Sequence, residues 1–399
     1  MSDPWKEWIP GVLCREQLRK LAREGHIDHL ADPDGAIDQS SFDLSLSDEG
    51  YLLISRCVRP PRQMYMHALH EGKLVERLKP DKEGGYVLQA DNTYIFKLRE
   101  RLTYLDSAHI YGQATAKSSI GRLDVLARLI VDGMDYYDYF DPVGIQRGNS
   151  DLYLEITPFT FNIKVGEGVS LSQLRLFYGK PEMCTLSGAE LYGSLVRDSK
   201  NDSDGSLSVD LVPAHIAGPH RASAFCARQS PNGPPPIDLR RKAARVAPCP
   251  FWRLLKSDDH ETLRITRNLF YILRSKERLV MPKGVAVYCR AIDETIGEMR
   301  IHYAGFAHPF FGVGRRDNKE GTPLIFEVRE HNIDVNLHDG AKIARLVFYR
   351  MSEDCSEPAA NDCVPPPSGY NEQELTLSKF FEPWPEALEV DDDGIAISS

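Results

Sequence analysis

The sequence lacks closely spaced cysteines, which limits the disulfide and metal chemistry it can support. Its eight cysteines are dispersed without any CxxC pair, and the two nearest are Cys355 and Cys363. Dispersed thiols in a long chain are typical of a reducing compartment rather than of a disulfide framework. Structural and catalytic zinc sites commonly use paired Cys and His ligands, and this chain offers no such pairing. We therefore expect neither disulfides nor a protein-bound metal.

Long apolar runs and an excess of positive charge are also missing. No run of about 18 apolar residues occurs, so no membrane-spanning helix is expected. The start, MSDPWKEWIPG, has no basic segment followed by an apolar run, unlike a secretion signal. The net charge of −10 argues against a general nucleic-acid binder, which needs a basic surface, but a single nucleotide needs only a few local donors. These features predict a soluble cytoplasmic protein that binds neither membranes nor nucleic acid.

The residue pattern predicts a mainly β protein with few helices. Leu13, Leu18, Leu21 and Ala22 recur at helical spacing, and Gly25 ends this helix. Beyond it, short runs rich in Val, Ile, Tyr, Phe and Thr alternate with clusters of Gly, Pro, Asp and Asn. Such alternation is typical of an all-β fold built from many short strands.

The length of 399 residues predicts two domains. NDSDGSLS and SPNGPPP interrupt regular structure near the middle of the chain, and a PPPSG segment precedes an acidic end. We therefore expect a first domain at 1–198, a linker with an excursion of its own at 199–236, a second domain at 237–356 and a tail at 357–399.

The two halves contain matching segments, which indicates an internal duplication. DLYLEITPFTFNIKVGEGVSLSQLRLFY and PLIFEVREHNIDVNLHDGAKIARLVFY follow the same order of strand, turn, strand, glycine turn and strand. Glu155 and Glu327 both stand between apolar residues of the first strand, and Gly168 and Gly340 mark the same turn.

Four segments together resemble one enzyme superfamily. IDQSSFDLSLS lies early, ATAKSSIGRLDVLA carries two serines followed by an arginine, YAGFAHPFFGVG precedes LIFEV, and GYNEQELTLSKFF lies near the end. In this order they resemble motifs of the trimeric dUTPase and dCTP deaminase superfamily. The resemblance implies two tandem dUTPase-like domains, each a distorted β-barrel or jelly roll, with a few short helices.

The resemblance also implies site residues. Glu327 matches the general base, Glu155 is the second choice for that role, and Ser118 and Arg122 match positions that assist catalysis. His308 stands in the base-binding hairpin, where the family usually has Asp. The substrate-binding set implied by the resemblance is Lys117, Ser118, Ser119, Arg122, His308, Tyr370, Gln373 and Lys379.

The implied activity is hydrolysis of dCTP to dUTP and ammonia, which feeds dTTP synthesis. A single carboxylate can take a proton from water and pass it on if its pKa lies near the working pH. Mg²⁺ is expected only with the triphosphate. Zinc-dependent deaminases need H-x-E together with P-C-x-x-C, and the sequence contains neither pattern, so we expect no zinc.

The two halves have complementary losses. The first half keeps Ser118, Ser119 and Arg122 but replaces the hairpin, whereas the second keeps a hairpin and Glu327 but reads CRAIDET at the phosphate motif. Since the family builds each site from two neighbouring subunits, one composite site between the halves is expected. Two alternatives remain open: a dUTPase or bifunctional deaminase, and a non-catalytic nucleotide sensor. The resemblance further implies a homo-oligomer and inhibition by dTTP.

Overall fold

The computed structural model describes fifteen ranges of the chain. They are 4–30, 32–54, 65–103, 109–143, 151–197, 205–229, 233–241, 244–291, 300–301, 305–313, 321–329, 333–356, 373–387, 389–390 and 396–397. Within these ranges, no helix is long and apolar enough to cross a membrane.

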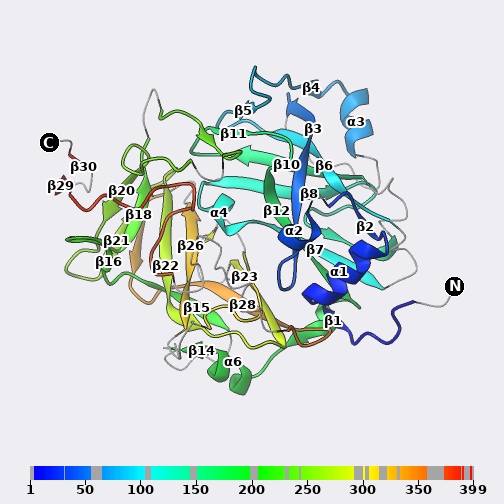
Figure 1. The fold of residues 1–399 in the computed structure, drawn as a ribbon. Coiled ribbons are helices and arrows are strands. Elements are labelled where there is room, and N and C mark those ends of the chain that lie inside the picture. Colours follow the sequence, from blue (N-terminus) through cyan, green and yellow to red (C-terminus); the bar gives the residue numbers. More distant parts are fainter. Residues whose placement is uncertain are drawn as a thin grey trace.

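The first half of the chain forms a ten-stranded sheet (Figure 1). Its main path is β8 (Val125–Val131), β10 (Asp151–Pro158), β6 (Tyr94–Leu102), β3 (Phe42–Leu53), β12 (Ser170–Tyr178), β7 (Ile110–Ala116) and β9 (Tyr139–Phe140). At its margins lie β1 (Gly11–Val12), β2 (Ile27–Asp28) and β4 (Val75–Arg77), and the helices are α1 (Arg15–Arg23), α2 (Pro33–Ala36), α3 (Tyr65–Glu71) and α4 (Ser118–Gly121). A separate sheet joins β5 (Tyr86–Leu88), β11 (Ile163–Val165) and β19 (Ile237–Asp238).

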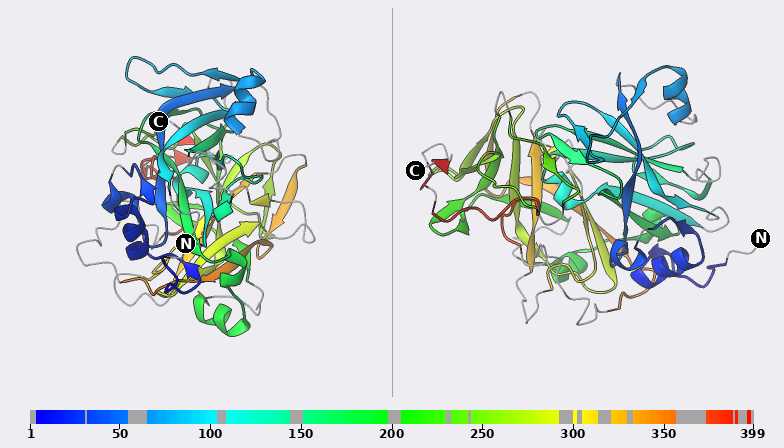
Figure 2. Two further views of the ribbon diagram at one scale, coloured as in Figure 1. Left: turned by 90° about the vertical axis from the view of Figure 1, so that its right-hand side faces the viewer. Right: turned by 45° about the horizontal axis from the view of Figure 1, so that its top comes forward.

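The second half forms an eleven-stranded sheet beside the first (Figure 2). Its main path is β20 (Trp252–Leu255), β18 (Ala224–Ala227), β22 (Phe270–Leu279), β15 (Ser206–Asp210), β28 (Lys342–Arg350), β23 (Val285–Ala291) and β25 (Gly305–Ala307). Off this path lie β13 (Thr185–Leu186), β14 (Val196–Arg197), β24 (Arg300–Ile301) and β26 (Thr322–Arg329). Three separate strand pairs are also described: β16 (Ala214–Ala217) with β17 (His220–Ala222), β21 (Thr262–Ile265) with β27 (Val335–His338), and β29 (Glu389–Val390) with β30 (Ala396–Ile397). The two short helices are the 3-10 helix η1 (Pro181–Cys184) and α6 (Ala189–Leu195).

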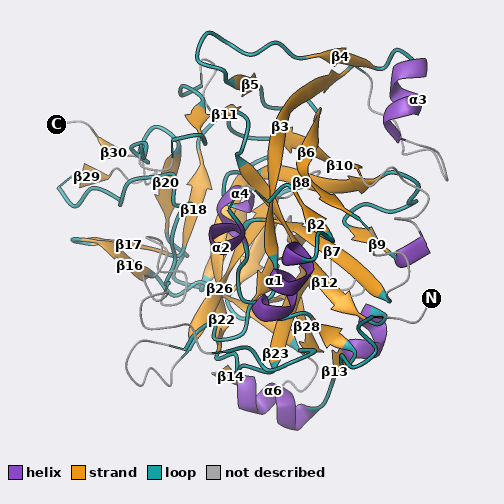
Figure 3. Cartoon of the chain, turned by 45° about the vertical axis from the view of Figure 1, so that its right-hand side comes forward, coloured by secondary structure: helices purple, strands orange, loops and turns teal. Residues whose placement is uncertain are grey.

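Strands dominate the chain, and helices are few and short (Figure 3). The predicted mainly β class is confirmed. The β propensity of the Val, Ile, Phe and Tyr runs, with turn residues between them, accounts for this outcome.

The same local arrangement occurs in both halves. Glu100 on β6 accepts hydrogen bonds from the backbone N–H and hydroxyl of Ser45, and Glu277 on β22 accepts the same two from Ser208. The backbone N–H of Gly168 donates to the carbonyl of Leu46 on β3, that of Gly340 donates to the carbonyl of Val209 on β15, and both glycines have φ near +78°. Only a residue without Cβ adopts this turn without strain. The halves are therefore structural repeats.

The first repeat ends before the boundary expected from the sequence. β13 pairs with β28 and β14 with β22, so residues 185–197 already belong to the second sheet. The order β13, α6, β14 repeats the order β1, α1, β2 of the first half. The segment 199–236, expected as a linker, contains β15 to β18. Gly218 and Pro219 form the turn between β16 and β17, whereas residues 233–236 lead to β19, which pairs with β11 of the first half.

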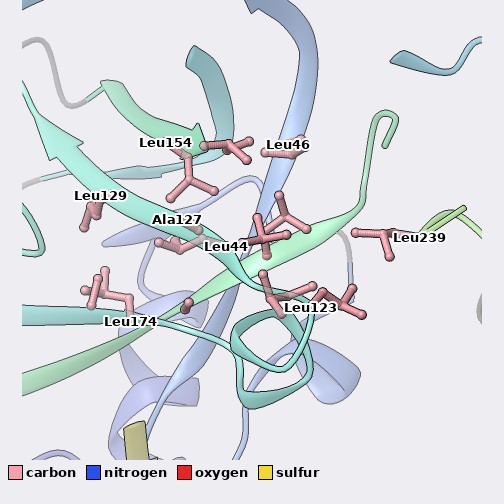
Figure 4. Packing of buried hydrophobic residues seen from close by; sticks show 14 of the residues in the cluster. Leu44, Leu46, Leu123, Ala127, Leu129, Leu154, Leu174 and Leu239 are labelled. Carbon is pink, nitrogen blue, oxygen red and sulfur yellow. The ribbon is translucent and has the colours of Figure 1, made fainter. Parts of the chain in front are cut away.

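The two halves share a hydrophobic core. The largest cluster contains Leu44, Leu154 and Leu174 of the first half (Figure 4) together with Trp252 and Phe381 from beyond it. Phe161 contacts the rings of both Trp252 and Phe381 with centroids 5.3 and 6.4 Å apart. This continuous packing holds the repeats in a fixed relation, which the site between them requires.

Candidate active site

The one-turn helix α4 presents the serine and arginine motif at the boundary between the halves. Strand β7 ends at Ala116, α4 spans Ser118–Gly121, and β8 begins at Val125. Ser118 is exposed, whereas Ser119 is buried. The carbonyl of Ser119 accepts a 2.6 Å hydrogen bond from Ser378 of the C-terminal segment, which comprises residues 373–387. The turn is therefore covered by a segment of the chain 259 residues away.

Arg122, directly after α4, approaches Glu327 of the second half. Its Nε lies 3.9 Å from Oε1 of Glu327, and their side chains are 3% and 8% exposed. Glu327 stands on β26 opposite Ile272 of β22. A turn of the first repeat and a strand of the second thus bring opposite charges together in a nearly closed space.

Residue Gln373 completes this group from the C-terminal segment. Arg122 Nη2 donates a 2.7 Å hydrogen bond to Oε1 of Gln373, and Gln373 Nε2 donates one of 3.2 Å to the carbonyl of Pro323. Arg122 Nη1 also donates to the carbonyl of Thr376 at 3.4 Å. The segment therefore lies over the Arg122–Glu327 pair.

Burial shifts the protonation of Glu327 toward neutral pH. Removal from water raises the pKa of Glu327 to about 7, and the nearby charge of Arg122 lowers it only in part. Cys289 of β23 lies close by, and burial together with the charge of Glu327 raises the pKa of its thiol to about 12. At neutral pH the carboxyl of Glu327 is therefore poised to exchange a proton while Cys289 stays neutral.

Lys117 and His308 belong to a second cluster between the halves. Lys117 Nζ forms an ion pair with Asp43 of β3, and His308 Nδ1 shares a 2.8 Å hydrogen bond with Ser40. His308 Nε2 lies 3.7 Å from Asp38, and burial lowers the pKa of His308. The hairpin of the second repeat is thus held against the first repeat by polar contacts.

Arg175 extends this second cluster and was not expected from the sequence. It is fully buried on β12, donates to the carbonyls of Val287 and Ala307 at 3.2 and 3.4 Å, and lies over the ring of Phe306. Burial lowers the pKa of Arg175 to about 9. The only signal in the sequence is an arginine inside the apolar strand LRLFY, which strand alternation alone assigns to the solvent face.

Glu155 occupies the same strand position in the first repeat, but its surroundings differ. Its Oε2 accepts 3.1 Å hydrogen bonds from the hydroxyls of Tyr65 and Tyr137. Arg128, opposite Glu155 in the β8–β10 pairing, forms an ion pair with Asp138. Glu155 is half-buried, and the structure brings it together with none of Ser118, Ser119 and Arg122 among the contacts of the described residues.

The remaining predicted residues lie in the C-terminal segment. Lys379 is half-buried, with Nζ 5.8 Å from the centre of the Phe380 ring, and Tyr370 lies outside the described residues. A cavity of about 340 Å³ runs beside this segment, and Gln373, Lys379 and Trp384 are among its lining residues. Across the part of the chain that the structure describes, no group of three or more His, Cys, Asp or Glu side chains could hold a metal ion.

Known protein families and a solved structure resemble both halves of the chain. The models of the 2′-deoxycytidine 5′-triphosphate deaminase N-terminal and C-terminal domains match residues 9–180 and 187–381. The crystal structure of 2′-deoxycytidine 5′-triphosphate deaminase from Agrobacterium tumefaciens aligns with a TM-score of 0.75 and 28% identity, covering 87% of this chain and 99% of that one. No sequence among curated proteins matches the chain. The two domain matches, in this order on one polypeptide, show that the chain belongs to the 2′-deoxycytidine 5′-triphosphate deaminase family in its tandem-domain form.

Proposed function

We propose that this enzyme hydrolyses dCTP to dUTP and ammonia at one composite site per chain, with Glu327 as the general base. The observation that carries the proposal is the buried Arg122–Glu327 pair, in which each half supplies one member. A carboxyl with a pKa of about 7 is suited to accept a proton from water and to return it within one catalytic cycle.

The reaction balances with these groups alone. Glu327 takes a proton from water as the oxygen adds to carbon-4 of the cytosine ring, and passes this proton to ring nitrogen-3. Collapse of the tetrahedral intermediate transfers a proton to the exocyclic amine and expels ammonia, leaving a carbonyl at carbon-4. Arg122 holds the carboxylate in place and stabilises negative charge that develops nearby.

Ser118 is suited to contact the phosphates, since its side chain is exposed at the start of α4. Mg²⁺ enters this scheme as part of the substrate, bound to the triphosphate. Zinc has no role in it, because the sequence contains neither the H-x-E nor the P-C-x-x-C pattern of zinc-dependent deaminases.

Ammonia release from dCTP, dCMP, CTP and dUTP tests the proposal directly. We expect ammonia from dCTP in the presence of Mg²⁺ and in stoichiometric yield with dUTP. Pyrophosphate release in the dUTP arm would instead support the bifunctional alternative, and dTTP added to the dCTP arm tests inhibition. Absence of ammonia from every cytosine nucleotide, in protein that binds dCTP, would support a nucleotide sensor.

A further inference from the structure

A second ion pair of reversed polarity lies beside the Arg122–Glu327 pair. Two residues beyond Arg122, Asp124 contributes the negative charge, and two residues beyond Glu327, Arg329 contributes the positive one. Arg329 Nη2 contacts Oδ2 of Asp124, and their side chains are 10% and 0% exposed. Since side chains two apart on a strand point to the same face, Glu327 and Arg329 both project from β26 toward the first half.

Asp124 is held rigidly by its own repeat. It has a φ of +59°, in the left-handed region, at the junction of the α4 turn and β8. Its carbonyl accepts a 2.9 Å hydrogen bond from the backbone N–H of Phe159, and its Oδ2 accepts one of 2.5 Å from the hydroxyl of Thr160. The carboxylate is therefore a fixed anchor at the end of the motif that carries Arg122.

Arg329 spans the two repeats. Its Nη1 donates a 2.9 Å hydrogen bond to the carbonyl of Asn268 in the second half, while its Nη2 donates one of 2.6 Å to the hydroxyl of Thr160 in the first. The guanidinium also lies 5.7 Å from the centre of the Phe159 ring. A planar group with several donors in fixed directions can make these contacts at once, which a lysine cannot.

We infer that Asp124 and Arg329 are positioning residues, which set the register between the α4 turn and β26 and thereby the separation of Arg122 from Glu327. The inference rests on the proposed role of Glu327. Two ion pairs of opposite polarity, side by side, favour one alignment of the two elements, because a shift along the strand would bring like charges together. The chemistry depends on that alignment, since misplacement of a catalytic group by about 1 Å can cost up to 100-fold in rate.

The groups that face Glu327 determine how its pKa would respond if Arg122 moved away. Arg122 faces it from the α4 turn, and Cys289 faces it from β23 as a neutral thiol. Gln373 from the C-terminal segment holds Arg122 itself. Loss of the aligned Arg122 charge would therefore raise the pKa of Glu327, and the rate would then need a higher pH to reach its plateau.

The test uses the full-length enzyme with Arg329→Lys, Thr160→Val and the double variant Asp124→Asn/Arg329→Gln. Arg329→Lys should lower kcat about tenfold, raise KM less, and move the acid limb of the kcat profile to higher pH. Thr160→Val keeps both charges and the side-chain shape while removing the bridging hydroxyl, and should shift both quantities in the same direction by a smaller factor. The double variant removes both charges together and should lower kcat at least as much as Arg329→Lys.

Arg264→Gln is the matched control, because it removes an exposed ion pair with Asp334 in the second half. It should leave kcat, KM and the pH profile unchanged. Folded Arg329→Lys and Thr160→Val variants with wild-type kcat and an unmoved acid limb would overturn the inference. An inactive wild-type enzyme would instead refute the proposed function, so the two failures are distinguishable. If Arg329→Lys does not fold, the outcome for Thr160→Val decides.

Discussion

Glu155 and Glu327 occupy the same strand position in two repeats, yet only one lies in a setting suited to acid–base chemistry. Glu327 is nearly closed off from solvent beside Arg122, which comes from the other repeat. Glu155 is half-buried and accepts hydrogen bonds from Tyr65 and Tyr137, both of its own repeat. The strand position is the same in both repeats, but the element that faces the carboxylate sets its surroundings.

The cations near the two carboxylates behave differently as well. Arg122 lies 3.9 Å from Glu327 of the other repeat, whereas Arg128 is paired with Asp138 of its own repeat. Burial raises the pKa of Asp138 to about 6, although the charge of Arg128 beside it acts in the opposite direction. The two copies of the strand therefore keep the same place in the sheet while the groups that face their glutamates differ.

The largest expected contrast is between two matched substitutions, Glu327→Gln and Glu155→Gln. Glutamine keeps the size and hydrogen bonding of glutamate but cannot accept the proton from water, so Glu327→Gln should lower kcat at least about 100-fold. Glu155→Gln should stay within about threefold of wild type, since it keeps an acceptor for both tyrosines. Steady-state ammonia release with dCTP, together with equilibrium dCTP binding, measures both. The opposite ranking of the two variants would move the catalytic role to the first repeat.

A second contrast separates Arg122 from Arg128. Arg122→Ala removes a cation from a buried site that receives a triphosphate, and should weaken dCTP binding by roughly 30-fold or more, equivalent to about 2 kcal/mol or more. Arg128→Ala removes a partner of Asp138 and should leave dCTP affinity near that of wild type. Titration calorimetry with each change combined with Glu327→Gln avoids turnover during the measurement. Equal losses for both variants would contradict a single composite site.

Much of the composite site could be predicted because its residues lie in compact motifs. KSSIGR is clear only in the first half and the AGFAHPFFG hairpin followed by LIFEV only in the second, and this complementarity predicted that Arg122 and Glu327 would meet. Asp124 and Arg329 could not be predicted in the same way. A charged residue at the start or end of a strand usually faces solvent, and only the packing of the two repeats shows that these two are buried together.

The repeat boundary was the weaker part of the sequence prediction. β13 and β14 are two residues long and flank a short helix, so their pattern is too brief to distinguish from loop. Their place in the second sheet depends on pairing with β28 and β22, which lie far along the chain. Strands this short are defined by the strands with which they pair rather than by their own sequence. The Gly and Pro residues of the neighbouring turns predicted a loop instead.

A third prediction concerns stability and pH. Burial raises the pKa of Glu327 from 4.5 to about 7, so the folded protein prefers the protonated form. Such a group contributes stability below the unfolded-state pKa, and that contribution is lost as pH rises through the folded-state value. Relative to Glu327→Gln, wild type should therefore lose about 3 kcal/mol between pH 4.5 and pH 8. Urea unfolding of both proteins across this range measures the difference, and any pH-independent effect of the substitution cancels.

The smallest expected effect concerns the C-terminal segment. Among the described contacts, this segment covers Glu327 but not Glu155. Gln373→Ala removes the acceptor of Arg122 Nη2 and the donor to Pro323, so the segment should release Arg122 more readily. Both hydrogen bonds are buried, and their loss should raise KM for dCTP about three- to tenfold, the range expected for roughly 1 kcal/mol of binding energy. Glu386→Ala is the matched control, since Glu386 lies farther along the same segment, is exposed and does not line the cavity. Steady-state kinetics with dCTP measure both variants, and a KM unchanged by Gln373→Ala would mean that the contact with Arg122 does not hold the segment over the substrate.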